Sequence, residues 1–168
     1  MFQAFTKKLL LVLIFSISSV LVAEDYQPGK HYQVLSEPIA TRDSKKIEVI
    51  EFFWFGCGHC YSLENQLNSW EKKLSADVDF WRSPITWNEM AKTHAKLFYA
   101  AEFFKKPDII ASTFVSIHAN QRMMTSEREL EPFFASYGIA QDQYQSLFNS
   151  FAMQNKIRRA DTLSLIHI

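Results

Sequence analysis

The chain has 168 residues, and its 18 lysine and arginine residues balance 18 aspartate and glutamate residues. This neutrality argues against a nucleic-acid-binding protein, which would carry a basic excess, and a hydrophobic share of 48% argues against disorder. The length supports one domain, or one domain with an insertion, and the presence of only 2 cysteines excludes a scaffold of several disulfides.

The N-terminal segment 1–23 has the pattern of a cleaved secretory signal. Lys7 and Lys8 precede an apolar stretch at 9–22, and Ala23 supplies the small residue expected at the cleavage point. The stretch is shorter than the about 20 residues that a membrane-spanning helix needs, with an uncleaved anchor or a buried helix as the alternative. Export would place both cysteines in an oxidising compartment.

The next part of the chain has the pattern of an α/β core. Three segments have the β-branched and aromatic composition of strands: residues 31–35, 46–55 and 78–82. The second segment is followed by Gly56 and then by a Cys57-Gly58-His59-Cys60 motif. Apolar residues then recur at helical spacing over 61–74. This order predicts the N-terminal part of a thioredoxin-like core at 24–86.

The remainder of the chain is expected to be helical. Helical spacing of apolar residues and capping signals predict helices over residues 87–104, 109–118, 130–137 and 141–161. We assign 87–152 to a helical insertion and 153–168 to the start of a return to the core. Helical periodicity ends near Asp161, so 163–168 is expected to be non-helical.

The two cysteines occupy positions that suit a redox-active dithiol. Cys57 follows a strand and opens a helix, where unpaired N–H groups and the helix dipole favour a thiolate. His59, when protonated, can stabilise that thiolate further. A stabilised thiolate is a good leaving group, so a disulfide between Cys57 and Cys60 would be easy to reduce and would act as an oxidant.

Other uses of a cysteine pair fit the sequence less well. Haem attachment requires a histidine directly after the second cysteine, where this chain has Tyr61. A structural zinc site would need two more ligands, but no paired spacing exists among the remaining histidines, His31, His94, His118 and His167. An inert structural disulfide is a further alternative, although such bridges usually close longer loops. We therefore expect neither a metal nor an organic cofactor.

Short blocks around the motif resemble the DsbA family of periplasmic thiol:disulfide oxidoreductases. Glu51-Phe52-Phe53 before the motif and Tyr61 after it resemble the family's active-site block. Leu35 with Pro38-Ile39-Ala40 is similar to its N-terminal strand signature, and Asn149-Ser150-Phe151 to a signature of its late helix. The likeness extends over residues 29–161. It implies an α/β fold in which a thioredoxin-like core carries an inserted all-helical domain.

The resemblance also implies roles for individual residues. Cys57 matches the exposed nucleophile, Cys60 matches its buried partner, and His59 matches the residue that tunes the thiolate. Glu51 matches a buried acid that assists proton transfer at the second cysteine. A solvent-facing position on the strand is the alternative for Glu51.

Further residues match the family at less specific positions. Arg82 lies where the family has a lysine near the buried acid, and Glu64 matches a nearby carboxylate; ordinary surface charge is the alternative for both. Trp54 and Phe55 could form an apolar surface that binds substrate, with core packing as the alternative for at least one of them. Gly58 replaces the proline of the best-known members, which leaves the redox potential open.

The resemblance implies that a cis-proline loop should follow Asp161. The chain has no Val-Pro or Thr-Pro element in that region. We therefore expect a C-terminally truncated copy that lacks the last strands and helix of the fold, with final residues that are foreign to the original reading frame.

These interpretations predict a periplasmic dithiol oxidase, a monomer that transfers its disulfide to unfolded or folding exported polypeptides. By the resemblance alone, a quinone-linked membrane oxidase would re-oxidise it. A disulfide isomerase or reductase of the same superfamily and a non-catalytic chaperone-like binding module are the alternatives. The chain could also lack any activity as a fragment.

Overall fold

The computed structural model describes residues 25–37 and 39–167, so the predicted signal segment 1–23 lies outside the described residues. Contacts divide the chain into two compact units, with the boundary between Ala40 and Thr41. Within 25–37, Pro28 and Tyr32 form an isolated β-bridge around Gly29, which has a φ of 80°. The predicted strand at 31–35 is wrong. The turn hydrogen bond from Gly29 N to Tyr32 O is local, and no neighbouring strand pairs with this segment in the described part of the chain.

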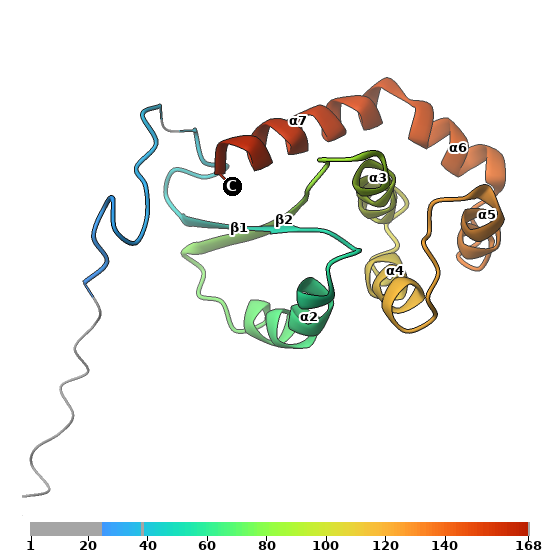
Figure 1. Cartoon of the computed structure of the whole chain (residues 1–168), viewed down its shortest axis with the longest axis horizontal. Helices are drawn as coiled ribbons and strands as arrows, with labels where there is room; N and C mark the ends of the chain where they lie inside the picture. The colour runs from blue at the N-terminus through green and yellow to red at the C-terminus, as the bar shows by residue number, and fades with distance from the viewer. Residues whose placement is uncertain (1–24, 38, 168) are drawn as a thin grey trace, which may run out of the picture. The chain divides into compact units, whose positions relative to one another are not determined.

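The second unit begins with a β–α–β motif. Strand β1 (Ile47–Phe53) and strand β2 (Val78–Pro84) pair in parallel, with Ile47 opposite Val78 and Phe53 opposite Pro84. Helix α2 (Gly58–Glu71) connects them, as a parallel pair requires a crossover connection. Figure 1 shows α2 on one side of the two strands and the last helix on the other.

The helical part follows β2 much as predicted. Its helices are α3 (Glu89–Phe103), α4 (Asp108–His118), α5 (Glu127–Ala135), α6 (Gln141–Asn149) and α7 (Phe151–His167). The predicted capping signal before α5 is confirmed, because Ser126 and Glu129 form a capping box. Helix α3 starts later than predicted because the side chain of Asn88 accepts from Ala91 N at 2.8 Å and caps the helix there.

The single helix predicted over 141–161 is two helices. Ser150, with φ −69° and ψ 152°, leaves the helical conformation and separates α6 from α7. Its hydroxyl donates to Leu147 O at 2.8 Å and accepts from Met153 N at 3.1 Å, so one side chain bonds to the end of α6 and to the start of α7.

Helix α7 also continues beyond Asp161, so the prediction of a non-helical end is wrong for the described residues. Thr86 donates to Asp161 Oδ1 at 2.8 Å, and Trp87 Nε1 donates to Ser164 Oγ at 3.3 Å. Ser164 is fully buried. Contacts with the segment after β2 therefore stabilise turns that the local apolar pattern does not predict.

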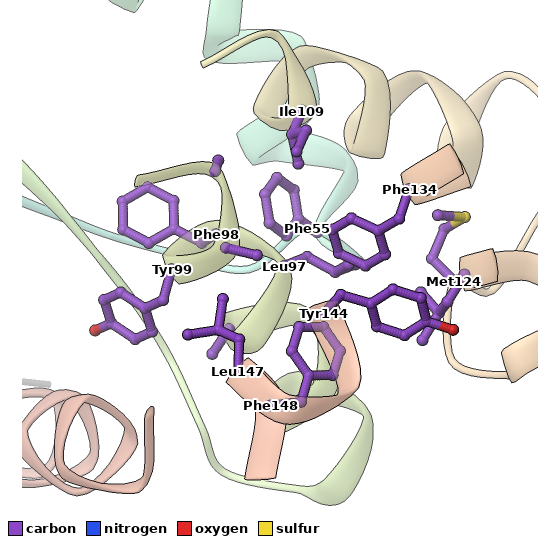
Figure 2. Close-up of a cluster of buried hydrophobic side chains, with 14 of the residues drawn as sticks. Phe55, Leu97, Phe98, Tyr99, Ile109, Met124, Phe134, Tyr144, Leu147 and Phe148 are labelled. Carbon is purple, nitrogen blue, oxygen red and sulfur yellow. The ribbon is translucent and has the colours of Figure 1, made fainter. Parts of the chain in front are cut away.

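The hydrophobic core lies mainly among α3, α4, α5 and α6 and extends to the end of β1. Figure 2 shows its aromatic centre, in which Phe55, Phe134 and Tyr144 are completely buried. Phe134 and Tyr144 stack with their ring centroids 4.5 Å apart. Burial of each such side chain contributes about 2 kcal/mol to folding. Among the described helices, none combines the length and the apolar character that crossing a bilayer requires.

Candidate functional site

The cysteine motif lies at the N-terminus of α2, as predicted. Cys57 is the N-cap residue, and its Sγ accepts a hydrogen bond from Cys60 N at 3.4 Å. A short loop joins it to β1, and a bond of 2.9 Å from Cys57 N to Trp54 O closes that loop. Both cysteines are free thiols in this structure. The first sulfur therefore lies over the unpaired N–H groups of the helix, where a thiolate is stabilised.

The two thiols are in different electrostatic environments. Burial raises the pKa of Cys57, but hydrogen bonds from Cys60 and from the backbone N–H groups of Cys60 and His59 outweigh this effect and lower it. Burial, and the hydrogen bond to the Cys57 sulfur, raise the pKa of Cys60 to about 11. Near neutral pH, the first cysteine is therefore the better thiolate and Cys60 holds a proton.

The two residues between the cysteines are both exposed. The backbone N–H of His59 acts on the Cys57 thiolate directly. A Cβ atom at Gly58 would meet no atom within 4 Å. The position would therefore accept a larger residue, and packing does not explain the glycine.

Glu51, Glu64 and Arg82 are brought together, as the resemblance implied. The parallel register places Glu51 opposite Arg82, whose Nε donates to Glu51 Oε2 at 2.5 Å. The guanidinium also donates to Glu64 on α2 and lies 4.5 Å above the Phe53 ring. All three charged side chains are only 12% exposed, which excludes ordinary surface charge for Arg82 and Glu64 and a solvent-facing position for Glu51.

Glu51 is poised to exchange a proton. Burial raises its pKa by more than the charge and hydrogen bond of Arg82 lower it. Its negative charge also raises the pKa of both cysteines. Because its pKa is raised above that of an ordinary carboxyl group, Glu51 holds a proton more readily than an exposed glutamate does.

The two aromatic residues after β1 have different environments. Phe55 is 0% exposed and packs edge-on against Phe114 with ring centroids 4.8 Å apart, so the suggested substrate-binding role is wrong for Phe55. Trp54 is partly exposed, and its ring lies over Gly56, where any Cβ would overlap it. A contact between Trp54 and substrate stays a prediction.

Two histidines of the helical part contact this loop, which sequence reasoning missed. His94 is buried and stacks on Trp54 with centroids 6.0 Å apart. His118 bonds to Phe55 O at 2.8 Å and stacks on Tyr61 with centroids 4.8 Å apart. His94 is 40 residues from Trp54 and His118 is 63 residues from Phe55 in sequence, and neither has a motif of its own, so no local signal pointed to these contacts.

No group of three or more His, Cys, Asp or Glu side chains is arranged to hold a metal ion within the described ranges. The groups that the site brings together are the two sulfurs and the Glu51 carboxyl group, whose charge acts on both of them. The arrangement consists of one stabilised thiolate, one protonated thiol and one buried acid. It is suited to exchange of a disulfide with another dithiol.

Comparison with known proteins agrees with this chemistry. The chain is 34% identical to the thiol:disulfide interchange protein DsbA of Pseudomonas aeruginosa over 146 residues, which cover 86% of this chain and 69% of the relative. The crystal structure of Pseudomonas aeruginosa DsbA superposes with a TM-score of 0.75, over 85% of this chain and 75% of that one. The chain belongs to the DsbA family.

Other DsbA proteins are similar to a comparable extent. The DsbA of Burkholderia cepacia is 30% identical over 164 residues, covering 94% of this chain and 77% of the relative. No model of a known protein family matches the sequence. As a DsbA-family member, the chain is a thiol:disulfide oxidoreductase, and the predicted thioredoxin-like α/β fold with a helical insertion is confirmed.

Proposed function

We propose that this DsbA-family chain is a periplasmic oxidase that donates the Cys57–Cys60 disulfide to exported polypeptides while they fold. The observation that carries the proposal is the contrast between the two thiols at one helix N-terminus. The pKa of Cys57 is lowered and the pKa of Cys60 is raised. The lowered pKa of Cys57 stabilises the reduced form and favours transfer of the disulfide to the substrate.

In the first step, a substrate thiolate attacks the Cys57 sulfur of the disulfide. The Cys57–Cys60 bond breaks, a mixed disulfide forms, and the electron pair goes to the Cys60 sulfur. That sulfur takes up a proton, because a thiol with a pKa of about 11 is protonated near neutrality. Glu51 is the proposed proton donor, supported by its raised pKa and by the effect of its charge on Cys60.

In the second step, a second substrate thiolate attacks the substrate sulfur of the mixed disulfide. The substrate disulfide forms, and Cys57 leaves as a thiolate. Two electrons have then passed from the substrate dithiol to the enzyme. The lowered pKa of Cys57 makes it a good leaving group and supports this direction of reaction.

The enzyme must then be re-oxidised, and we propose that a quinone-linked oxidase of the membrane accepts its electrons. Family membership supports this partner. The periplasmic location has two supports, the DsbA relatives and the basic and apolar pattern at 1–23. Folding of substrates in the periplasm would supply the dithiols that the reaction consumes.

The function is tested by mixing the oxidised full chain with a reduced peptide that contains two cysteines. We expect stoichiometric oxidation of the peptide, which is followed by mass spectrometry, and no oxidation by Cys57→Ala. The Cys60→Ala variant is the matched control, because it keeps Cys57 but cannot form the Cys57–Cys60 disulfide, so it should also leave the reduced peptide unoxidised.

Two results would contradict an oxidase. Efficient reshuffling of scrambled ribonuclease together with poor oxidation of the peptide would indicate an isomerase. Undiminished assistance to refolding by Cys57→Ala would indicate a binding module, because that variant cannot exchange disulfides.

A further inference from the structure

His118 reaches the active-site loop from the helical part of the molecule. It is the last residue of α4, and its Nε2 lies 2.8 Å from the carbonyl oxygen of Phe55. A carbonyl oxygen can only accept, so Nε2 carries the hydrogen and donates it. Phe55 lies two positions before Cys57, in the loop that leads from β1 to the cysteine motif.

The same imidazole also contacts the other side of the dithiol. Its ring is stacked on that of Tyr61, with centroids 4.8 Å apart and planes 7° from parallel. Tyr61 directly follows Cys60 and donates its backbone N–H to Cys57 O at 3.1 Å in the first turn of α2. His118 therefore holds the loop before the first cysteine and the helical turn after the second one.

The position of this loop decides how well the reduced site is stabilised. Cys57 Sγ accepts from Cys60 N at 3.4 Å, and the backbone of Trp54 donates to the Cys60 sulfur. Such bonds are directional and weaken when donor and acceptor are misaligned. In the oxidised protein the S–S bond itself holds the two residues together. The loss of the His118 contacts should therefore cost the reduced form more than the oxidised form.

We propose that His118 is a positioning residue that fixes the Cys57 loop against the first turn of α2 and thereby makes the dithiol a stronger oxidant. The proposal rests on the proposed function, because it concerns the redox equilibrium of the same cysteine pair. It also assigns a role to the helical insertion, whose helix α4 contributes the imidazole to the active site.

The test compares full-chain variants in redox equilibrium with glutathione. His118→Phe keeps a ring for stacking and removes the donor, and His118→Gln keeps a donor at about the position of Nε2. His94→Phe is the matched control, because it removes a 2.8 Å bond to a carbonyl outside the cysteine loop, that of Met123, and keeps a ring to stack on Trp54. Ultraviolet absorbance of the thiolate gives the pKa of Cys57 in each variant.

For His118→Phe we expect the equilibrium constant to shift towards the disulfide by about three- to tenfold, the range of one hydrogen bond, and the pKa of Cys57 to rise. His118→Gln should recover most of the shift, and His94→Phe should match the wild type. Circular dichroism checks that each variant folds. If His118→Phe does not fold, Tyr61→Leu, which removes the stack and keeps the hydrogen bond, is expected to shift the equilibrium in the same direction.

An unchanged equilibrium constant in a folded His118→Phe, or in Tyr61→Leu when it is the variant used, would overturn the proposal. An equal shift in His94→Phe would also overturn it, because the effect would then be a general consequence of the lost stability. These results are distinct from a failure of the proposed function. That failure would appear as a wild-type protein that does not oxidise the reduced peptide at all.

Discussion

The ionisation of individual side chains in the site is set by three kinds of surroundings: backbone hydrogen-bond donors, burial and an ion pair. Cys57 is stabilised as a thiolate by backbone donors in its own helix turn. The raised pKa of Cys60 results first from burial. Glu51 combines burial with a strong pair to Arg82, whose guanidinium neutralises two carboxylates at once. An arginine suits this position because its planar group can bond both partners and always keeps its charge.

Arg82→Met is expected to reduce the free energy of unfolding by about 3 kcal/mol at pH 7, because it leaves two largely buried carboxylates without their cation. The loss should be smaller at pH 4. Without Arg82 the pKa of Glu51 in the folded protein rises further. A group whose pKa is raised by folding stabilises the folded state while it is protonated, and it destabilises that state as the pH rises. Urea unfolding at the two pH values measures both effects.

The matched control for this prediction is Arg42→Met. Arg42 is 48% exposed and lies 3.5 Å from Asp79, so its loss should cost less than about 1 kcal/mol. Equal losses in the two variants, or a larger loss for Arg82→Met at pH 4 than at pH 7, would contradict the assignment of a buried charge cluster.

At the scale of elements, the positions at which the helices begin and end determine how they are arranged. Cys57 begins α2, Asn88 caps α3, and the Ser126–Glu129 box begins α5. The break at Ser150 allows α6 to pack in the aromatic core while α7 runs past the sheet, as Figure 1 shows. Side-chain caps therefore determine where these three helices start.

Ser150→Ala is expected to destabilise the protein by about 1 kcal/mol, because Met153 N loses the oxygen that accepts its hydrogen bond. Ser146→Ala is the matched control, an exposed serine inside α6 that should be neutral or slightly stabilising because alanine favours helices. Thermal or urea unfolding of both variants measures the difference. A result in which Ser146→Ala costs as much as Ser150→Ala would exclude a capping role.

At the scale of the whole molecule, the ionisation of two thiols is linked to global stability. Only the reduced protein has thiols to titrate, so its stability depends on pH in a way that the oxidised protein does not share. The two thiols act in opposite directions, because the pKa of one is lowered and that of the other is raised.

We expect the stability of the reduced chain, relative to the oxidised chain, to rise with pH up to about 9, the ordinary thiol pKa. In this range the unfolded state binds more protons, because the lowered pKa of Cys57 makes it lose its proton at a lower pH in the folded state than in the unfolded state. Between pH 9 and about 11 the trend should reverse, because Cys60 then holds its proton in the folded state and loses it on unfolding.

Guanidinium unfolding of both redox forms across this pH range tests the prediction. A double variant, Cys57→Ala with Cys60→Ala, should lose both pH effects and is the control for the other titratable groups. A relative stability that falls as the pH rises from 6 to 9 would show that the pKa of Cys57 is not lowered.

The sequence alone determined the features that depend on near neighbours. The strand composition before Gly56, the cysteine motif at a helix start and the Ser126 capping box are local, and each was read from a few consecutive residues. The tertiary structure decided the burial of Phe55, the approach of His118 to the cysteine loop, and the grouping of Glu64 with Arg82. It also decided the helical turns after Asp161, which depend on contacts with residues 86 and 87. Such contacts join residues that are distant in the chain. They can stabilise the protein only after the core has formed and brought those residues together.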